Sequence, residues 1–445
     1  MDFQFSKQIP LEERFDVLVA GGGPAGCAAA IAAARNGASV LLVEASGTLG
    51  GMGTTGLVPA WAPFSDGKSI VYRGIAQEIF ELSKSCMQHV KPDATDWVAL
   101  DSEALKRIYD KLVRDSGATV LFHTHVADVV REGARIDVAV LANKSGLTAC
   151  RAKCYIDCTG DADVVAFAGF PYLYGDEQTG GIQPTTLCFT LTNVDEYHYK
   201  NWYTPENKMT DVMVALYHSD KYPLVTDNLS CNSLVGPRTV GFNCGHLWDV
   251  KPTDPYNLST ALMQGRELAY QIWAGVCEQW PDAFASSFLV STAQMLGVRE
   301  SRRIVGEYTL TAQDYLQKKS FPDEIGRNSY YMDVHLSKEE SDLVLEGKKT
   351  FEEFDKGRAS YAPGESHGIP YRSLIPKGAE NLLVAGRIIS CDHQLQGSVR
   401  VMPICLVTGQ AAGTAAAMAV QCGAASKVDP EELRTRLLQD GVYFM

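Results

Sequence analysis

A short apolar segment followed by a glycine-rich turn near the N-terminus constrains this chain most. Residues 15–26 read FDVLVAGGGPAG, and the spacing G-x-G-x-x-G falls on Gly21, Gly23 and Gly26. The apolar run before the turn and the alanine-rich run after it predict a strand and a helix. In this context the first glycine permits a tight turn, the second lets backbone approach a pyrophosphate, and the third lets helix and strand pack closely. The alternative is a turn of the same spacing that binds nothing.

A second strand and an acidic residue complete the pattern. Residues 39–43 read SVLLV and are followed by Glu44, at about the distance from the glycines where an acid binds an adenosine ribose. Pro24 and Ala25 lie at the predicted start of the helix, where free amides and the helix dipole favour a phosphate. The sequence therefore predicts a dinucleotide-binding unit within a parallel sheet.

Length and charge narrow the class of protein. The 445 residues predict about two to three domains, and 46% hydrophobic with 21% charged residues is typical of a globular protein. The formal charge of −13 disfavours nucleic acid and anionic membranes as main partners. Residues 1–10 lack the features of a signal peptide, and no stretch has the apolar length of a membrane span. We expect a cytoplasmic protein that can form a homo-oligomer.

The twelve cysteines are scattered, and we expect reduced thiols. Cys150, Cys154 and Cys158 are spaced four apart, which raises the possibility of a metal site. Three cysteines at this spacing on extended chain do not all face one ion. Small buried hydrophobic side chains are the preferred interpretation, so no metal is expected.

A glycine-rich loop and several regular elements follow. Residues 47–58, GTLGGMGTTGLV, predict close backbone approach to something flat or anionic, with a flexible linker as the alternative. Helical periodicity covers 70–83 and 101–116, the second capped by Ser102. Residues 120–152 alternate as in an antiparallel meander.

Two further segments carry candidate polar residues. His123 and His125 alternate on one face of the first meander strand and are interpreted as ordinary strand histidines. In YIDCTGDAD, residues 155–163, a short strand ends at Thr159 and Gly160 before an acidic helix start. The helix dipole alone is sufficient to explain the acidic residues there.

The C-terminal part returns to small and apolar residues. Residues 381–384, NLLV, predict a strand that leads into Gly386 and Arg387. The loop 390–402, SCDHQLQGSVRVM, precedes a long small-residue helix at 403–420, which begins with proline where the missing N–H costs little.

These motifs together resemble the FAD-dependent oxidoreductase family related to the flavoprotein subunits of fumarate reductase and succinate dehydrogenase. The resemblance rests on GGGPAG with Glu44, the GGMGTTGLVPA loop, YIDCTGDAD and the C-terminal segment, and it is strongest at the two ends of the chain. It implies FAD, held noncovalently because no histidine follows the 47–58 loop where some relatives tether the cofactor. Arg387 stands where many flavoproteins have aspartate, which leaves the ribityl contact open. The cofactor contacts that the resemblance implies are Gly21, Gly23, Pro24, Ala25, Gly26, Glu44, Gly50, Gly51, Met52, Thr159, Gly160, Asp161, Gly386, Arg387, Gly409 and Ala412.

The expected fold is α/β. It combines a Rossmann-like FAD-binding domain, with a parallel sheet and an antiparallel meander, over 1–168 and 361–445, and an inserted mixed α+β substrate domain over 169–360. In the insert, Arg299 and Arg302 are three apart and would share a helix face, from which they could clamp a carboxylate. Pairing with neighbouring glutamates is the alternative.

The candidate catalytic residues lie near the C-terminus. His393 and Arg400, with Gln396, fall on the loop that the resemblance places at the flavin, and His367 and Arg372, with Tyr371, precede it. Histidine suits proton transfer near neutral pH, and arginine can hold an anion. A packed loop histidine, and pairing of Arg400 with Asp392, are the alternatives.

Two patterns are missing from the sequence. It has neither a second dinucleotide fingerprint nor a redox CxxC, so electrons pass to or from a substrate, oxygen, a quinone or a carrier protein. We expect an FAD-dependent dehydrogenase or reductase that transfers hydride between flavin N5 and a small polar substrate: a hydroxy acid, an unsaturated acid or a sugar derivative. The alternatives are an oxygen-using oxidase or monooxygenase, a macromolecule-modifying flavoprotein, and a fold relic without activity.

Overall fold

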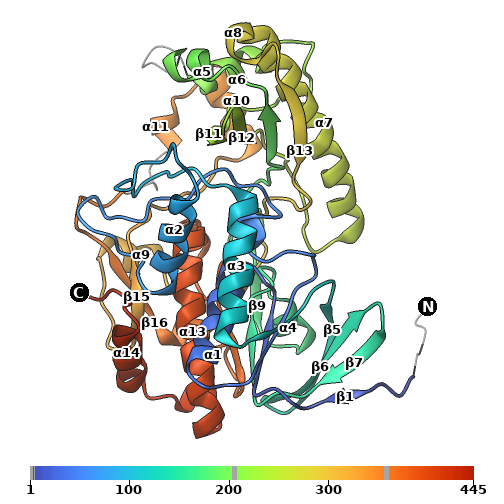
Figure 1. Cartoon of the computed structure of the whole chain (residues 1–445), viewed down its shortest axis with the longest axis vertical. Helices are drawn as coiled ribbons and strands as arrows, with labels where there is room; N and C mark the ends of the chain where they lie inside the picture. Colours follow the sequence, from blue (N-terminus) through green and yellow to red (C-terminus); the bar gives the residue numbers. More distant parts are fainter. Residues whose placement is uncertain (1–3, 5, 203–207, 355–359) are drawn as a thin grey trace.

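The computed structural model describes residues 4, 6–202, 208–354 and 360–445 (Figure 1). Its parallel sheet has five strands. The strand order is β17-β8-β2-β3-β4. The middle strands β8, β2 and β3 are buried on both faces, and the sequences of β2 and β3 are apolar throughout, as such burial favours. The strands span Leu382–Val384, Cys154–Asp157, Val17–Ala20, Val40–Val43 and Thr119–Leu121. The predicted parallel sheet is confirmed.

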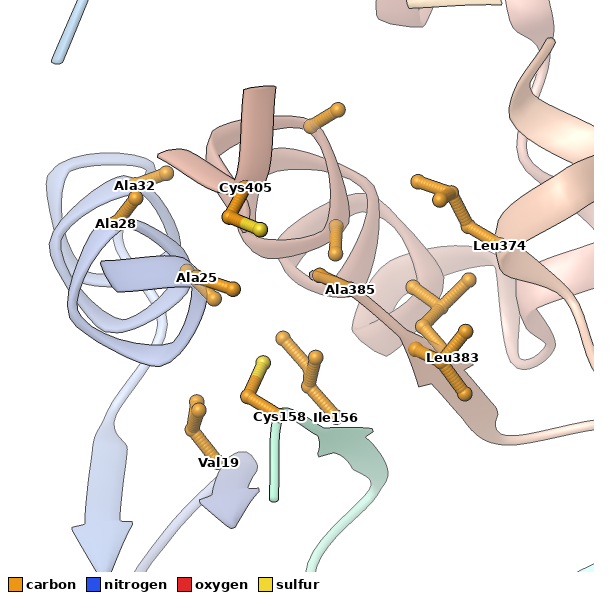
Figure 2. Packing of buried hydrophobic residues seen from close by; sticks show 14 of the residues in the cluster. Val19, Ala25, Ala28, Ala32, Ile156, Cys158, Leu374, Leu383, Ala385 and Cys405 are labelled. Carbon is orange, nitrogen blue, oxygen red and sulfur yellow. The ribbon is translucent and has the colours of Figure 1, made fainter. Parts of the chain in front are cut away.

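Helices α1 (Pro24–Arg35) and α13 (Met402–Cys422) pack side by side on one face of this sheet. Figure 2 shows Ala25 and Cys405 from the two helices close to Val19 and Cys158 beneath them. By length and composition alone α13 could cross a membrane, but 94% of its most apolar window is buried inside the protein. It is therefore the central helix of this core.

The predicted meander is also confirmed. Strands β5 (His125–Glu132), β6 (Arg135–Asn143) and β7 (Gly146–Cys150) pair antiparallel, and β1 (Leu11–Glu12) adds to β7. The first strand begins later than expected, because His123 adopts a positive φ of 49° in the bend after β4. His123 and His125 therefore do not share one strand.

A second sheet lies at the other end of the molecule, at the top of Figure 1. Its order is β11-β12-β10-β13, all antiparallel. The strands span Ser230–Gly236, Thr239–Cys244, Phe189–Thr192 and Phe288–Thr292. The helices around it are α5 (Glu196–Trp202), α6 (Met209–Tyr217), α7 (Pro255–Gln279) and α8 (Pro281–Phe284). We call this sheet with these helices the cap.

Buried apolar side chains form two clusters. The larger one surrounds the parallel sheet, and the smaller one, between Leu187 and Leu296, fills the cap. Buried residues from Ile304 to Met332, which the sequence assigns to the insert, pack in the larger cluster. The domain boundaries stay predictions.

The remaining elements connect these parts. Two helix starts differ from expectation: α2 begins at Ile75 rather than at residue 70, and α3 is capped by Asp101 rather than by Ser102, since the Asp101 carboxylate accepts from two helix amides.

The three cysteines spaced four apart, Cys150, Cys154 and Cys158, are buried thiols. Burial raises the pKa of Cys150 to about 11 and of Cys154 to about 12. Within the described residues, no three His, Cys, Asp or Glu side chains gather as a metal site. The other bounds are η1 Gly51–Gly53, α2 Ile75–Ser85, α3 Ser102–Ser116, α4 Asp163–Phe167, β9 Tyr172–Tyr174, β14 Arg302–Ile304, α9 Ala312–Leu316, β15 Glu324–Asn328, α10 Lys338–Leu345, α11 Phe351–Phe354, β16 His367–Pro370, η2 Tyr371–Leu374, α12 His393–Val399, η3 Ala425–Lys427 and α14 Pro430–Gln439.

Candidate active site

The turn between β2 and α1 is open where a dinucleotide pyrophosphate is expected. Helix α1 has Gly23 at its N-cap and no side-chain cap, so its first amides face outward. A Cβ added at Gly23 would meet no atom within 4 Å, whereas one at Gly26 would lie 1.7 Å from the carbonyl oxygen of Gly21. The space in front of α1 and the close strand–helix contact fit the two glycine roles.

Glu44 lies at the end of β3, beside this turn. Its carboxylate accepts hydrogen bonds from the amides of Gly22 and Ser46, both at 2.7 Å. The 47–58 loop then folds back over the turn: Gly50 N–H donates to Gly22 O at 2.8 Å, and a Cβ on Gly51 would lie 3.0 Å from Gly23 Cα. These contacts exclude a flexible linker.

Arg387 links the ends of two neighbouring strands of the parallel sheet, β17 and β8. It follows β17, and its guanidinium donates to Gly160 O at 2.6 Å and to Asp161 Oδ1 at 3.0 Å. Thr159 turns inward and donates to Asp157. Arg387 therefore orders the loop after β8 and also lines the large cavity described below. An aspartate at this position could not make these contacts.

Gly409 and Ala412 are buried in the contact between α13 and α1. A Cβ on Gly409 would lie 2.1 Å from Ala25 O, and Ala412 is fully buried. The structure shows close packing at Gly409 and full burial at Ala412, and the cofactor contacts implied for them stay predictions. The end of α13 that faces the cavity is its start, where Val401 and Met402 line the wall and no side chain caps the helix.

A cavity of about 1440 Å³ separates the larger core from the cap. Met52, Arg387 and Met402 line it from the first, and Cys188, Cys231 and His246 from the second. Its volume exceeds the roughly 300–1000 Å³ of ordinary ligand pockets. A flavin ring and a substrate could therefore occupy it together.

Arg299 is the most buried cation on this wall, at 7% exposure. It donates to Pro184 O at 2.7 Å, to Thr186 Oγ1 at 3.0 Å and to His335 Nε2 at 3.1 Å. Within the described residues these hydrogen bonds use Nε and Nη1 only, and every acceptor is neutral. Burial and the nearby Arg400 lower the pKa of Arg299 to about 10.

Arg400 ends α12 on the same wall. Its Nη2 donates to the Asp333 carbonyl at 2.9 Å and carboxylate at 3.1 Å, while its buried Nε has no hydrogen-bond partner within the described residues. Asp392 does not pair with Arg400. Instead it caps α12 by accepting from Leu395 N at 2.7 Å. The predicted 390–402 loop is thus partly a helix.

Behind Arg299 lies a hydrogen-bonded histidine pair. His335 Nδ1 is 2.9 Å from His246 Nε2, and His246 Nδ1 is 3.3 Å from Asp227 Oδ2. Burial, then Arg299, places the pKa of His335 well below its usual value, and burial lowers that of His246. Both rings are therefore neutral near pH 7.

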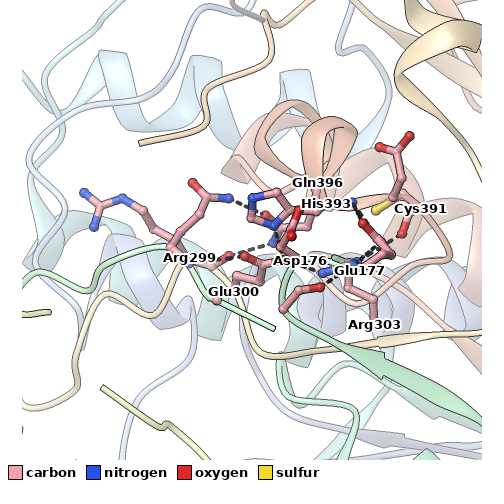
Figure 3. Close-up of polar contacts among 12 residues, drawn as sticks. Asp176, Glu177, Arg299, Glu300, Arg303, Cys391, His393 and Gln396 are labelled. Atoms are coloured by element: carbon pink, nitrogen blue, oxygen red, sulfur yellow. Dashed lines mark hydrogen bonds and ion pairs between the residues drawn. The ribbon is translucent and has the colours of Figure 1, made fainter. Parts of the chain in front are cut away.

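His393 belongs to a separate polar cluster on the other side of Arg299. Its Nδ1 lies 2.9 Å from Glu300 Oε1, and the buried Arg303 also pairs with Glu300 and with Glu177. Figure 3 shows this cluster, with the Arg299 side chain pointing away from it. Gln396 connects the two regions by donating to Arg299 O at 2.6 Å.

Only Arg400 of the four predicted catalytic side chains lines the cavity. His367 is fully buried against Tyr361, and Arg372 pairs with Asp323 at 2.9 Å elsewhere. Their antiparallel contacts in β15–β16 and the turn η2 hold them there. Catalytic roles for His367, Arg372 and His393 stay predictions, and position does not support them.

The expected helical clamp of Arg299 and Arg302 is wrong. Arg302 begins β14, which pairs with β9, and it donates to Asp161 O and to Asp163 rather than lining the cavity with Arg299. Sequence reasoning missed Asp227, Asp333 and His335. The one available signal is that the last two alternate as polar residues within the apolar run YYMDVHL.

Comparison with solved structures finds several distant likenesses. A flavin-dependent brominase has 13% identity and a TM-score of 0.47, covering 96% of this chain and 83% of that one. The myxobacterial chondrochloren halogenase has 14% sequence identity and a TM-score of 0.46, and the match covers 96% of this chain and 78% of that one. A geranylgeranyl bacteriochlorophyll reductase-like protein from Thermoplasma acidophilum has 13% identity and a TM-score of 0.42, and the match covers 96% of this chain and 83% of that one. At these values none of them assigns a reaction. No curated protein matches.

The family itself is clear. The sequence matches the FAD dependent oxidoreductase family over residues 16–437, which is nearly the whole chain. The open glycine turn, the uncapped start of α1 and the carboxylate of Glu44 beside them are the parts that such a cofactor requires. The chain belongs to the FAD dependent oxidoreductase family, and it is an oxidoreductase that uses FAD.

Proposed function

We propose that this enzyme oxidises or reduces a substrate that carries an anionic group, such as a hydroxy acid or an unsaturated acid, in the cavity between the larger core and the cap. Arg299 carries the proposal. Asp333 and Asp227 act on this buried guanidinium only through space, and its hydrogen bonds all go to neutral acceptors, so it favours an anion in direct contact, because a buried charge without a directly paired counter-charge is costly. A substrate carboxylate supplies that charge.

The role proposed for each residue follows from where it lies relative to the glycine turn and the cavity. The turn at Gly21 to Gly26 and Glu44 hold the adenosine half of FAD noncovalently, and the start of α13 faces the cavity. When bound, FAD supplies two-electron chemistry by accepting or donating hydride at N5. Arg299 and Arg400 orient the substrate anion, and Arg400 can also stabilise oxyanion charge through its unpartnered Nε. The relation to the fumarate reductase and succinate dehydrogenase flavoproteins is part of this proposal.

An anaerobic spectrum tests it. Purified FAD-loaded protein is mixed with hydroxy acids and with uncharged polyols of the same size, and the flavin absorbance is followed. Bleaching by acids alone supports oxidation of an anionic substrate, and reoxidation of dithionite-reduced protein by an unsaturated acid supports the reverse direction. Arg299→Ala should lose either response, and Arg299→Lys should recover little of it because an ammonium lacks the guanidinium fork. Equal bleaching by uncharged polyols contradicts the proposal.

A second candidate is an oxygen-using flavoenzyme. The cavity is larger than a small hydroxy acid requires, and Trp97, Tyr330 and Tyr331 line it beside the charged residues. These features also suit an aromatic acid. If aromatic acids speed oxygen consumption by the reduced enzyme, while hydroxy acids never bleach the flavin of the oxidised enzyme, this candidate replaces the first.

A further inference from the structure

Arg299 is the end of a chain of polar contacts that leads away from the cavity; its first two links are hydrogen bonds and its last is a charge contact. Arg299 Nε donates to His335 Nε2 at 3.1 Å, His335 Nδ1 is 2.9 Å from His246 Nε2, and His246 Nδ1 is 3.3 Å from Asp227 Oδ2. The residues come from four separate segments, the loops before β11, after β12, before β14 and before α10. Folding of the cap against the larger core is what brings them together.

The chain permits only one direction for its protons. Arginine nitrogens are donors only, so His335 Nε2 must accept and His335 Nδ1 must carry the proton. That proton points to His246 Nε2, which therefore accepts. The remaining proton is on His246 Nδ1, which lies 3.3 Å from Asp227 Oδ2 without forming a hydrogen bond, so the carboxylate favours this tautomer by its charge. Asp227 is fixed in turn, since its carboxylate accepts from the amides of Leu229 and His246, both at 2.7 Å.

The charges around the chain agree with neutral histidines. Arg299, Asp227 and Asp333 are the charged groups that face the two rings, and each ring also faces the other. Burial is the largest effect on both, and it lowers their pKa values. Burial alone raises the pKa of Asp227, but His246 and the backbone amides outweigh it, so Asp227 is ionised.

We infer that Asp227, His246 and His335 are positioning residues that fix the guanidinium of Arg299 for an anionic substrate; this inference rests on the proposed function. A carboxylate in direct contact with Arg299 would neutralise it and compete with the substrate. Two neutral rings hold Nε instead, and the carboxylate of Asp227 sets their tautomers from a distance. The guanidinium thus stays oriented and keeps its charge for the ligand.

The tautomers can be measured directly. FAD-loaded protein with ¹⁵N-labelled histidine has nine rings to observe, and His246→Asn and His335→Asn assign the two signals. Both rings should be neutral with the proton on Nδ1 at about pH 7. A proton on Nε2 of either ring, or an imidazolium, overturns the inference whatever the substrate is.

Asp227→Asn tests the effect on Arg299. An amide N–H facing His246 Nδ1 favours the opposite tautomer, which places the proton of His335 on Nε2 against Arg299 Nε. Malonate, titrated into the FAD-loaded protein and followed by the flavin spectrum, should bind about tenfold more weakly than to wild type. Asp323→Asn is the matched control, since Asp323 is also buried but pairs with Arg372 outside the cavity.

The possible outcomes distinguish a failure of the positioning role from a failure of the proposed function. If Asp227→Asn binds malonate like wild type while Arg299→Ala does not, the positioning role is wrong and the proposed function stands. If Arg299→Ala also binds malonate normally, the proposed function fails and the positioning role fails with it. If only Arg299→Ala and Asp227→Asn lose affinity and the ring tautomer of His335 reverses in the latter, the inference is supported.

Discussion

At the scale of single residues, two glycines of one motif have opposite surroundings. Gly23 faces open space, and its φ of −68° is available to any residue. Gly26 has no room, because the carbonyl of Gly21 lies where a Cβ would go. Gly23 thus faces the expected ligand and Gly26 serves packing, so substitution of the two glycines should affect FAD binding and stability separately.

Gly23→Ala should leave the stability of the FAD-free protein within about 0.5 kcal/mol of wild type. It should weaken FAD binding at least about tenfold, because the methyl group enters the space kept for the pyrophosphate. Gly26→Ala should instead destabilise the protein with or without FAD. Thermal unfolding and FAD titration measure both effects. If Gly23→Ala binds FAD normally, this space is not the pyrophosphate site.

His393 should stabilise the protein in a pH-dependent way. Burial is the largest single effect and lowers its pKa, but the hydrogen bond to Glu300 and the charge of Glu300 together outweigh burial, and the net shift is upward. A raised folded-state pKa gives stabilisation that is full below the usual value near 6.5 and is lost as pH rises through the folded pKa. The melting-temperature difference between wild type and His393→Gln should therefore be larger at about pH 5.5 than at about pH 8.5.

The control is His125→Gln, which changes an exposed histidine on β5. Its melting-temperature difference from wild type should be small and nearly the same at both pH values. A His393→Gln difference that grows toward alkaline pH would contradict the assigned pair with Glu300.

Sequence reasoning reached the cofactor half of the site better than the substrate half. The glycines, Glu44 and the 47–58 loop lie within one continuous stretch, where local rules of strand, turn and helix apply. Arg299 meets His335, His246 and Asp227 only through the packing of distant loops, which no local spacing encodes. For that reason the sequence identified Arg299 as a candidate but gave it the wrong partner, Arg302.

At the scale of elements, α1 and α13 pack closely through small residues. Gly409 and Gly413 lie one helical turn apart, and a Cβ on either would be 2.1 Å from a carbonyl oxygen of α1. The sequence predicted both helices but assigned Gly409 to the cofactor. Small residues in a buried helix serve close packing as readily as ligand approach, and periodicity cannot distinguish the two uses.

Gly413→Ala should lower the free energy of unfolding by about 1–3 kcal/mol, because the helices must move apart to admit the methyl group. Its contact with Ala29 lies about one helical turn beyond Gly26, so FAD affinity should change less than stability does. Urea unfolding and FAD titration give the two values. Gly236→Ala is the control, since a Cβ there meets no atom within 4 Å and its φ is not positive. A neutral Gly413→Ala would show that this contact is not tight.

At the scale of the whole molecule, the site depends on two separately packed cores. The larger core carries the cofactor turn and Arg400, and the cap carries His246 and the loops beside it. The composition and periodicity of the sequence indicated an insert, but they could not show that residues 304–332 pack with the larger core. Loosening the cap should therefore damage substrate binding before it damages FAD binding.

Phe242→Ala tests this separation. Phe242 is fully buried in the cap and stacks on Phe189 with 4.9 Å between ring centroids. Loss of a buried phenylalanine costs about 3–5 kcal/mol. Hydrogen exchange should rise in peptides from 187–296 and stay unchanged in 17–43, with FAD content retained and malonate binding weakened. Phe80→Ala, in the stacked pair with Phe64 of the larger core, should give the opposite pattern. If Phe242→Ala raises exchange equally in both regions, the two clusters unfold as one cooperative unit, and substrate binding cannot be weakened separately from FAD binding.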